Sequence, residues 1–154
     1  MKQLTFLTAF LLTTGILSAQ EAPYKQALGI KFPGGFSFTY KNFVRPTQNI
    51  ELQANIWQKG FRTSALYEFN YPITDLDGLR LFFGPGAHVG FWAARYKEQY
   101  NNSADIGVDG IIGVDYKFAD FPINISVDWQ PSIVLIGNST FTPNIGGLAI
   151  RYTF

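Results

Sequence analysis

The sequence contains no cysteine, which excludes disulfide bonds, thiolate metal sites and lipid anchors attached through a cysteine. Charge is scarce and balanced: 12 Lys and Arg residues stand against 11 Asp and Glu residues, a net charge of +1. Such a balance argues against a nucleic-acid-binding surface. After residue 20, no apolar run reaches the roughly 20 residues that a membrane-spanning helix needs. The length of 154 residues predicts a single domain.

Aromatic residues and glycine are abundant instead. The chain has 15 Phe, 8 Tyr and 15 Gly, and aromatic residues make up 17% of it. Aromatic side chains favour strands, and long Leu-rich stretches typical of helices are few. The composition therefore predicts an all-β protein.

The first 19 residues have the features of a secretory signal peptide. Lys2 supplies a positive charge, residues 4–17 form an apolar stretch, and Ser18 and Ala19 provide small residues for cleavage. The alternative is an N-terminal membrane anchor, which the shortness of the apolar stretch disfavours. We therefore expect a cleaved signal peptide at 1–19 and one barrel domain at 20–154. Leu17, at the third position before the expected cut, is unusual there, so the exact cleavage site stays undetermined.

The remaining chain alternates between apolar and polar residues, the period-2 pattern of strands. Gly, Pro, Asn and Asp gather at the breaks, as they do in turns. The expected strands are 25–32, 36–43, 49–58, 61–71, 79–93, 104–118, 123–135 and 144–154.

The two faces of these strands differ in an unusual way. The apolar face carries no charge, whereas the other face carries six cations, six anions and seven glycines. Glycine at a solvent-facing strand position weakens the strand and covers nothing, but it fits the crowded interior of a narrow barrel. Balanced charges are also tolerable in a confined interior. We therefore expect the polar face inside and the apolar face against lipid.

Eight strands make a barrel whose interior is just wide enough for side chains to fill it. The expected strands have 8–15 residues, and about 9–11 tilted residues span a bilayer. The predicted fold class is all-β, an eight-stranded antiparallel up-and-down transmembrane β-barrel. Aromatic residues near strand ends fit the girdles at membrane interfaces. They are Phe43, Tyr71, Phe91, Tyr116, Phe118, Trp129, Tyr152 and Phe154.

Four residues depart from the simple pattern. Trp57, Phe82 and Trp92 lie on the polar face, where we expect them to fill the space that the glycines leave and to plug the lumen. Pro85 lies within a strand on the lipid face, costs one hydrogen bond of the ladder and is expected to mark a bulge.

The stretch "GGLAIRYTF" ends the chain with Leu148, Ile150, Tyr152 and Phe154 on one face, and "FFGPGAHVGFW" forms a glycine-rich strand at 82–92. With the signal peptide and eight alternating strands, the mature chain resembles small outer-membrane β-barrels of the OmpA/OmpX-like superfamily. The resemblance implies the outer membrane of a Gram-negative bacterium, contact with its lipid, and an assembly signal (Ile150, Tyr152, Phe154) that the barrel-assembly machinery reads. The long outer loops of adhesive members are missing here.

With both termini in the periplasm, loops 33–35, 58–60, 94–104 and 136–141 face outward, and turns 43–49, 71–78 and 119–122 face the periplasm. Only 94–104 is long enough for a recognition loop, and its partner is unidentified. The candidate recognition residues are Arg95, Tyr96, Lys97, Glu98 and Tyr100.

The charged residues of the inner face predict a polar network in the lumen. Asp105, Asp109 and Asp115 lie about 13 Å or more apart along their strand, too far for one ion, so we expect no metal and no cofactor. The predicted network consists of Lys31, Glu51, Arg62, Glu68, Arg80, His88, Asp109, Asp115, Lys117, Asp128 and Arg151.

His88, the only histidine, allows two interpretations. It could act as the general base of a lipid-modifying barrel enzyme, as in some related barrels. We favour a histidine hydrogen-bonded to a carboxylate such as Glu68 or Asp109, because no serine follows within its strand.

The function we expect is therefore non-catalytic: a structural or interaction barrel in the outer membrane. A narrow channel for small solutes or ions is an alternative, as is the enzyme that uses His88. A secreted lipocalin-like binding barrel is the alternative fold. It would expose the twelve charges and seven glycines and would leave Phe154 unexplained.

Overall fold

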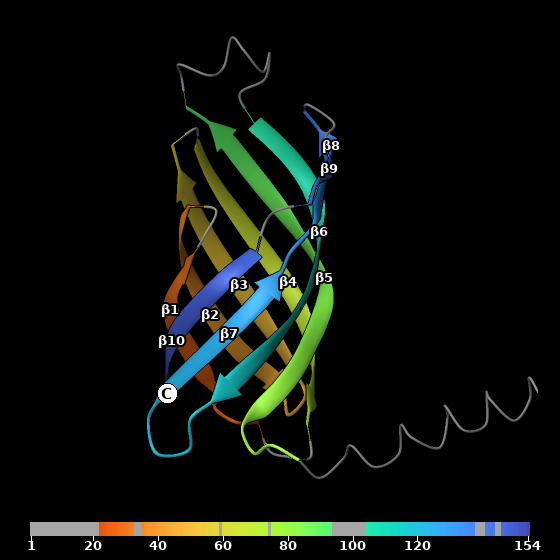
Figure 1. The fold of residues 1–154 in the computed structure, drawn as a ribbon. Helices are drawn as coiled ribbons and strands as arrows, with labels where there is room; N and C mark the ends of the chain where they lie inside the picture. The colour runs from red at the N-terminus through yellow and green to blue at the C-terminus, as the bar shows by residue number, and fades with distance from the viewer. Residues whose placement is uncertain are drawn as a thin grey trace, which may run out of the picture.

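A computed structural model describes residues 22–32, 35–58, 60–73, 75–93, 104–137, 141–143 and 146–154. They form a closed antiparallel barrel with eight wall strands, which confirms the predicted fold class (Figure 1). No helix in these ranges is long and apolar enough to cross a membrane.

The strands follow the expected segments closely. In chain order they are β1 (Gln26–Phe32), β2 (Phe36–Arg45), β3 (Gln48–Trp57), β4 (Gly60–Pro72), β5 (Leu79–Trp92), β6 (Ala104–Lys117), β7 (Ile123–Trp129), β8 (Ser132–Ile136), β9 (Phe141–Thr142) and β10 (Gly146–Thr153).

Two of the eight wall strands are interrupted. The expected segment 123–135 is divided into β7 and β8, which both pair with β6. Pro131 stands at this break and has no N–H to give to the ladder. The last wall strand is likewise divided into β9, which pairs with β8, and β10, which pairs with β7.

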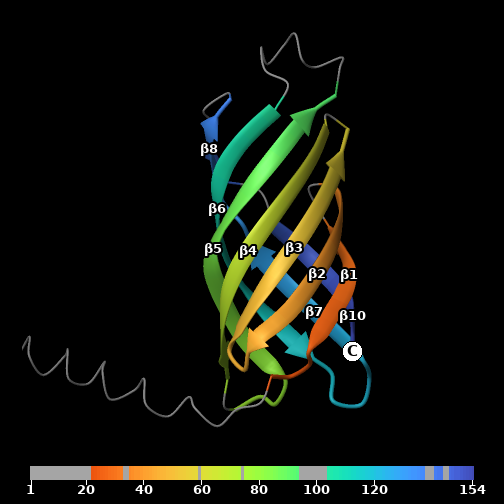
Figure 2. The same cartoon turned by 180° about the vertical axis from the view of Figure 1, so that it is seen from behind.

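β1 closes the barrel by pairing with β10, from Ala27 opposite Thr153 to Phe32 opposite Leu148. The Phe154 amide donates to the Gln26 carbonyl oxygen (2.9 Å), so the C-terminus and the start of β1 lie at one end. We call this the lower end, as it is drawn in Figure 1. Figure 2 shows the wall from behind, with β5 and β6 extending furthest toward the opposite, upper end.

Polarity is inverted across the wall. Large apolar side chains project outward, among them Leu28, Phe38 and Val127, with exposures of 53%, 51% and 54%. Most of the buried side chains in the described ranges are polar or charged, and they come from the other face of the same strands. Because successive residues of a strand point to opposite sides, the alternating sequence produces both faces at once.

Inward glycines let the wall and lumen pack closely. A Cβ atom at Gly84 would overlap the carbonyl oxygen of Tyr67, and one at Gly29 would overlap that of Ile150. Both positions therefore require glycine.

Two expectations about the wall were wrong. Phe43 does not join an outer aromatic girdle: it is on the inward parity, 8% exposed, and packs edge-to-face on Tyr24 with ring centroids 5.0 Å apart. Pro85 marks no bulge, because the pairs on either side of it, Leu66 with Gly86 and Phe69 with Phe83, keep one register. The irregularities lie instead between Phe43 and Arg45 and between Ile106 and Gly107.

Candidate functional site

Four charged side chains from different strands meet in the lower half of the lumen. Lys41 Nζ lies 3.3 Å from Glu51 Oε2 and 2.9 Å from Glu68 Oε2, and Arg151 Nη2 lies 2.8 Å from Glu51 Oε1. All four side chains are 0% exposed. We call them the lower network. Its two cations balance its two anions, which a buried group of charges needs.

Arg151 connects the lower network to the surrounding wall. Its Nε donates to Thr39 Oγ1 (2.8 Å), and its Nη1 donates to Ser126 Oγ (2.7 Å) and Asn124 Oδ1 (3.4 Å). With the Glu51 contact, one planar guanidinium links β10 to β2, β3 and β7, a geometry that lysine does not offer.

An apolar cluster of Leu66, Phe82 and Ile111 borders the lower network. The Lys41 ammonium lies 4.1 Å from the centre of the Phe82 ring, a cation–π distance. Leu66 and Ile111 share the parity of the inner charged residues. Sequence reasoning missed them, although that parity identifies both.

A second group of polar side chains extends from beside Phe82 toward the upper end of the lumen. Lys31 Nζ donates to Asp128 Oδ1 (2.6 Å) and Gln130 Oε1 (3.3 Å), and Gln130 Nε2 donates to Asp109 Oδ2 (3.4 Å). His88 Nδ1 lies 2.7 Å from Asp109 Oδ1. We call these five residues, together with Arg62, the upper network.

Arg62 completes the upper network with weaker contacts. Its Nη2 donates to Ser132 Oγ (3.1 Å) and lies 3.8 Å from Asp109 Oδ1. His88 Nε2 lies 3.8 Å from Asp105 Oδ1 and has no hydrogen-bond partner in the described part of the chain. His88 thus has an orienting carboxylate but no hydrogen-bonded serine among the described residues, so the third member of a nucleophilic triad is missing there.

Tyr24 and Phe43 close the lower end of the lumen. The Tyr24 hydroxyl donates to Asp115 Oδ2 (3.5 Å), which also accepts from Asn124 Nδ2 (3.0 Å). Burial raises the pKa of the Tyr24 phenol well above its ordinary value, so this group stays protonated as a donor. The Arg80 guanidinium lies 6.0 Å from the centre of the Phe43 ring.

The structure buries every residue of the predicted lumen set except Lys117. Lys117 is half-buried, and its ammonium donates to the carbonyl oxygens of Phe118 and Phe121 at the lower turn. Lys41, which the predicted set omitted, is central to the lower network. Its position on the same face of the strand as Ser37 and Thr39 would have identified it as a lumen residue.

The other predicted residues fall in three places. Ile150, Tyr152 and Phe154 point outward with exposures of 49%, 59% and 58%. Trp57 and Trp92 are half-buried and edge-to-face, with centroids 6.1 Å apart, at the ends of β3 and β5 rather than in the middle of the lumen. The candidate recognition loop and the signal peptide lie outside the described residues. No three metal-ligating side chains gather within the described ranges.

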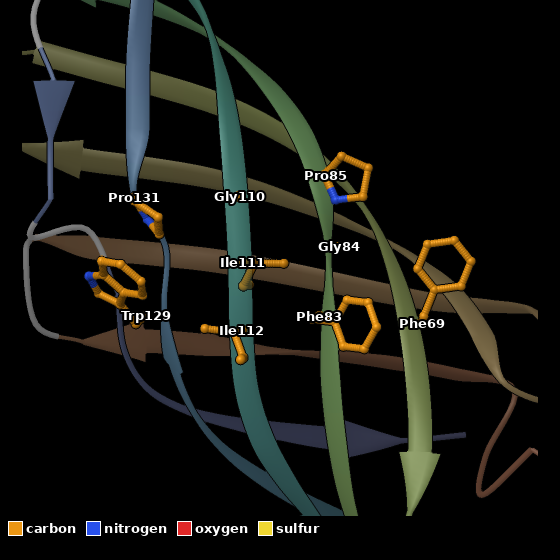
Figure 3. A pocket seen from close by; sticks show the side chains of 9 residues that line it. All are labelled: Phe69, Phe83, Gly84, Pro85, Gly110, Ile111, Ile112, Trp129 and Pro131. Carbon is orange, nitrogen blue, oxygen red and sulfur yellow. The ribbon is translucent and has the colours of Figure 1, made fainter. Parts of the chain in front are cut away.

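The outer face of the wall has a shallow pocket of about 310 Å³ (Figure 3). It is open on the outside, between β4 and the junction of β7 and β8. Its lining residues are Phe69, Phe83, Gly84, Pro85, Gly110, Ile111, Ile112, Trp129 and Pro131.

Comparison with known proteins identifies the fold. No protein-family model matches the chain, and no curated sequence matches it. Among solved structures, the N-terminal β-barrel domain of OprF from Pseudomonas aeruginosa superimposes with a TM-score of 0.60 and 14% identity, over 84% of this chain and 95% of that one. The fold is therefore the same β-barrel fold as that of the OprF domain.

Proposed function

We propose that this protein is an integral outer-membrane barrel of a Gram-negative bacterium, with a filled lumen and a structural or interaction role. The observation that carries the proposal is the inverted polarity of the wall. Apolar side chains cover the outside, and paired charges such as Lys41 and Glu51 fill the inside. A soluble barrel would bury the opposite face, whereas lipid is the solvent that suits this one.

The closure of the wall supports membrane embedding. Pairing of β1 with β10 joins the first and last strands from Ala27 to Phe32, and unpaired backbone groups are costly in hydrocarbon. The likeness to the OprF barrel agrees with this location.

The filled lumen favours a structural barrel over a channel. The lower network and the apolar cluster both lie inside the barrel, and the side chains of both are almost completely buried. We therefore expect the reconstituted protein to conduct no ions in planar bilayers. Stepwise single-channel currents in the wild type would support the channel instead.

We propose a non-catalytic role because His88 lacks a hydrogen-bonded nucleophile in the described residues. His88→Ala should leave the lipid A composition of the host unchanged, as mass spectrometry can determine. A changed lipid A profile would support the enzyme.

The C-terminal strand is proposed to carry the assembly signal. Ile150, Tyr152 and Phe154 present one outward apolar row, and Tyr152 and Phe154 stack with centroids 6.3 Å apart. Deleting Phe154 should lower the amount of folded barrel in the outer membrane without changing synthesis. Exchanging the inward Thr153 for serine is the control.

Cysteine labelling tests the orientation of the two faces, since the chain has no cysteine of its own. Val127→Cys places a thiol on the outward face, and Ser126→Cys, one residue away, places it on the buried face. In proteoliposomes, a fluorophore attached to the Val127→Cys variant should emit as in hydrocarbon, and the thiol of the Ser126→Cys variant should react only after unfolding. A Val127→Cys thiol that reacts readily with a charged, membrane-impermeant maleimide would contradict the proposal.

A further inference from the structure

Two shallow pockets on the outer wall meet at one residue, Pro85 in the middle of β5. The first is the pocket of about 310 Å³ in Figure 3. The second has a volume of about 380 Å³ and opens on the other side of Pro85, over β3 and β4. We call the pair the outer groove. The second pocket is lined by Ile50, Ala65, Leu66, Tyr67, Pro85, Gly86 and Ala87.

The floor of the first pocket is Gly110, which differs from the inward glycines. A Cβ atom at Gly110 would meet only Pro131 Cγ, at 3.8 Å, which is ordinary contact. A Cβ atom at Gly84 or Gly113 would overlap a backbone carbonyl oxygen. The packing of the wall therefore requires glycine at 84 and 113 but not at 110. What a side chain at 110 would do is fill the groove.

Two prolines flank this floor. Pro85 pairs with Gly110 on one side, and the Gly110 amide donates to the Pro131 carbonyl oxygen (2.9 Å) on the other. Figure 3 shows one proline ring on each side of the strand that carries Gly110, with the aromatic rings of Phe69, Phe83 and Trp129 around them. The missing side chain and the flanking rings together make a hollow in the apolar surface.

The groove offers apolar contact and little else. Its lining residues include no charged side chain. The polar atom of Trp129, Nε1, already donates to the Pro143 carbonyl oxygen (2.5 Å). The Tyr67 hydroxyl donates to Gln48 Oε1 (2.7 Å). An occupant therefore gains from burying hydrocarbon, and a polar ligand would lose its hydrogen bonds to water.

The size of the two pockets distinguishes between an alkyl chain and a second protein as the occupant. A cavity of about 150 Å³ holds a benzene-sized molecule, so each pocket takes a longer aliphatic segment. A stable protein interface buries about 800 Å² on each partner, far more than two shallow pockets provide. The groove also lies midway along β5 and β6, where the proposed membrane location places the hydrocarbon core. A flexible alkyl chain fits these conditions, and a second barrel does not.

We propose that the outer groove holds one acyl chain of a membrane phospholipid in a preferred position. This inference rests on the proposed membrane location. The chain would lie across Gly110 and along Pro85, with Phe69, Phe83 and Trp129 as its walls. Gly110 would determine this preference, because any larger residue occupies the space of the methylene groups.

Fluorescence quenching of Trp129 tests the proposal. Replacing the other two tryptophans, Trp57→Phe and Trp92→Phe, leaves Trp129 as the only emitter. This variant is reconstituted in phosphatidylcholine vesicles that contain increasing fractions of a phosphatidylcholine with brominated acyl chains. Brominated and unbrominated chains exchange at the groove, so the readout is the depth of quenching, because bromine quenches only an indole that it nearly touches. We therefore expect deep quenching of Trp129 at the highest fraction of brominated lipid.

Gly110→Leu should fill the pocket that Trp129 lines, move the chain away from the indole and lower the maximum quenching at least twofold. Ala54→Leu is the matched control, a small-to-large change on the outward face of β3, away from both pockets. It should leave the curve unchanged. Gly110→Ala serves in place of Gly110→Leu if the leucine variant fails to fold, which the heat-dependent gel shift reports.

Two results would overturn the proposal in distinguishable ways. Quenching that stays equally deep after substitution of Gly110 excludes the groove as its cause. Absence of quenching even in pure brominated lipid contradicts the membrane location itself, and with it the proposed function.

Discussion

The two polar networks of the lumen differ in how completely they are closed. The lower network joins Lys41, Glu51, Glu68 and Arg151 through contacts of 2.8–3.3 Å, and all four side chains are 0% exposed. The upper network has equally short contacts at Lys31, but Arg62 retains 10% exposure and lies 3.8 Å from the Asp109 carboxylate. The two networks therefore differ mainly at Arg62, the one member of the upper network whose side chain is partly exposed.

The neighbours of each network explain the difference. Leu66, Phe82 and Ile111 pack against the lower network, with the Phe82 ring centre 4.1 Å from the Lys41 ammonium, and Tyr24 and Phe43 cluster at the lower end. Removal from water strengthens each ion pair but makes an unpaired charge costly. The upper network is less enclosed at Arg62, whose side chain is 10% exposed, so water can compensate for a lost partner of Arg62.

The largest expected effect is that of Arg151→Leu. It removes the cation that pairs with Glu51 and the hydrogen bonds to Thr39 and Ser126, and breaking a buried ion pair costs about 3–5 kcal/mol. Urea unfolding in detergent micelles measures the loss. Lys31→Leu in the upper network is the counterpart and should lose less, because Lys31 contacts two side chains and Arg151 contacts four. Equal losses would remove the distinction between the networks.

Phe82→Ala is expected to destabilise the barrel by about 3 kcal/mol, near the lower end for such a cavity because water can enter a polar lumen. The same change exposes Lys41 and should produce small ion currents in planar bilayers. Phe83→Ala, on the outward face next to it, is the control and should conduct nothing. A silent Phe82→Ala barrel would show that the ion pairs alone close the lumen.

Asp109→Asn weakens the centre of the upper network, because the amide keeps the shape but loses the charge that faces His88 and Arg62. Hydrogen bonds to charged groups contribute about 1.5–3 kcal/mol, and the retained amide oxygen can still accept a hydrogen bond, which favours the lower value. Thermal unfolding followed by circular dichroism measures the change. A loss as large as that of Arg151→Leu would mean that the upper network is the principal support.

Tyr24→Phe should have the smallest effect, about 0.5–1 kcal/mol at neutral pH, because its hydrogen bond to Asp115 is long. Its pH dependence is more informative. The pKa of Tyr24 is raised on folding, so its contribution is complete below the ordinary tyrosine pKa of about 10 and is lost as pH rises toward the raised value. Above pH about 10, wild type should therefore lose more stability than Tyr24→Phe. Parallel pH profiles of the two proteins would contradict this.

Alternation in the sequence was sufficient to predict the eight wall strands and the two faces, because side-chain direction in a strand depends only on parity. Parity applied strictly also identifies Phe43, Leu66 and Ile111 as inward, and the errors at these positions came from weighing hydrophobicity above parity. The prediction that Lys117 belongs to the lumen network failed for another reason. Lys117 is the last residue of β6, and its ammonium donates to carbonyl oxygens of the lower turn.

The pairs within the lumen could not be predicted from the sequence. That Glu51 binds Arg151, 100 positions away, depends on the register and closure of the whole barrel. A shift of one residue between two strands would turn every side chain of one of them to the other face. The break between β7 and β8 also lay beyond prediction from the pattern, although Pro131 offered a signal.

We propose that the closed barrel spans a membrane with its apolar face toward the lipid. Fractionation of cells that express the protein, followed by gel electrophoresis with and without boiling, tests it most directly. We expect a protein in the outer-membrane fraction that migrates differently before and after boiling, because a closed barrel resists detergent until it is heated. A soluble periplasmic protein with a single mobility would contradict it and would make the apolar face a core or a ligand cavity.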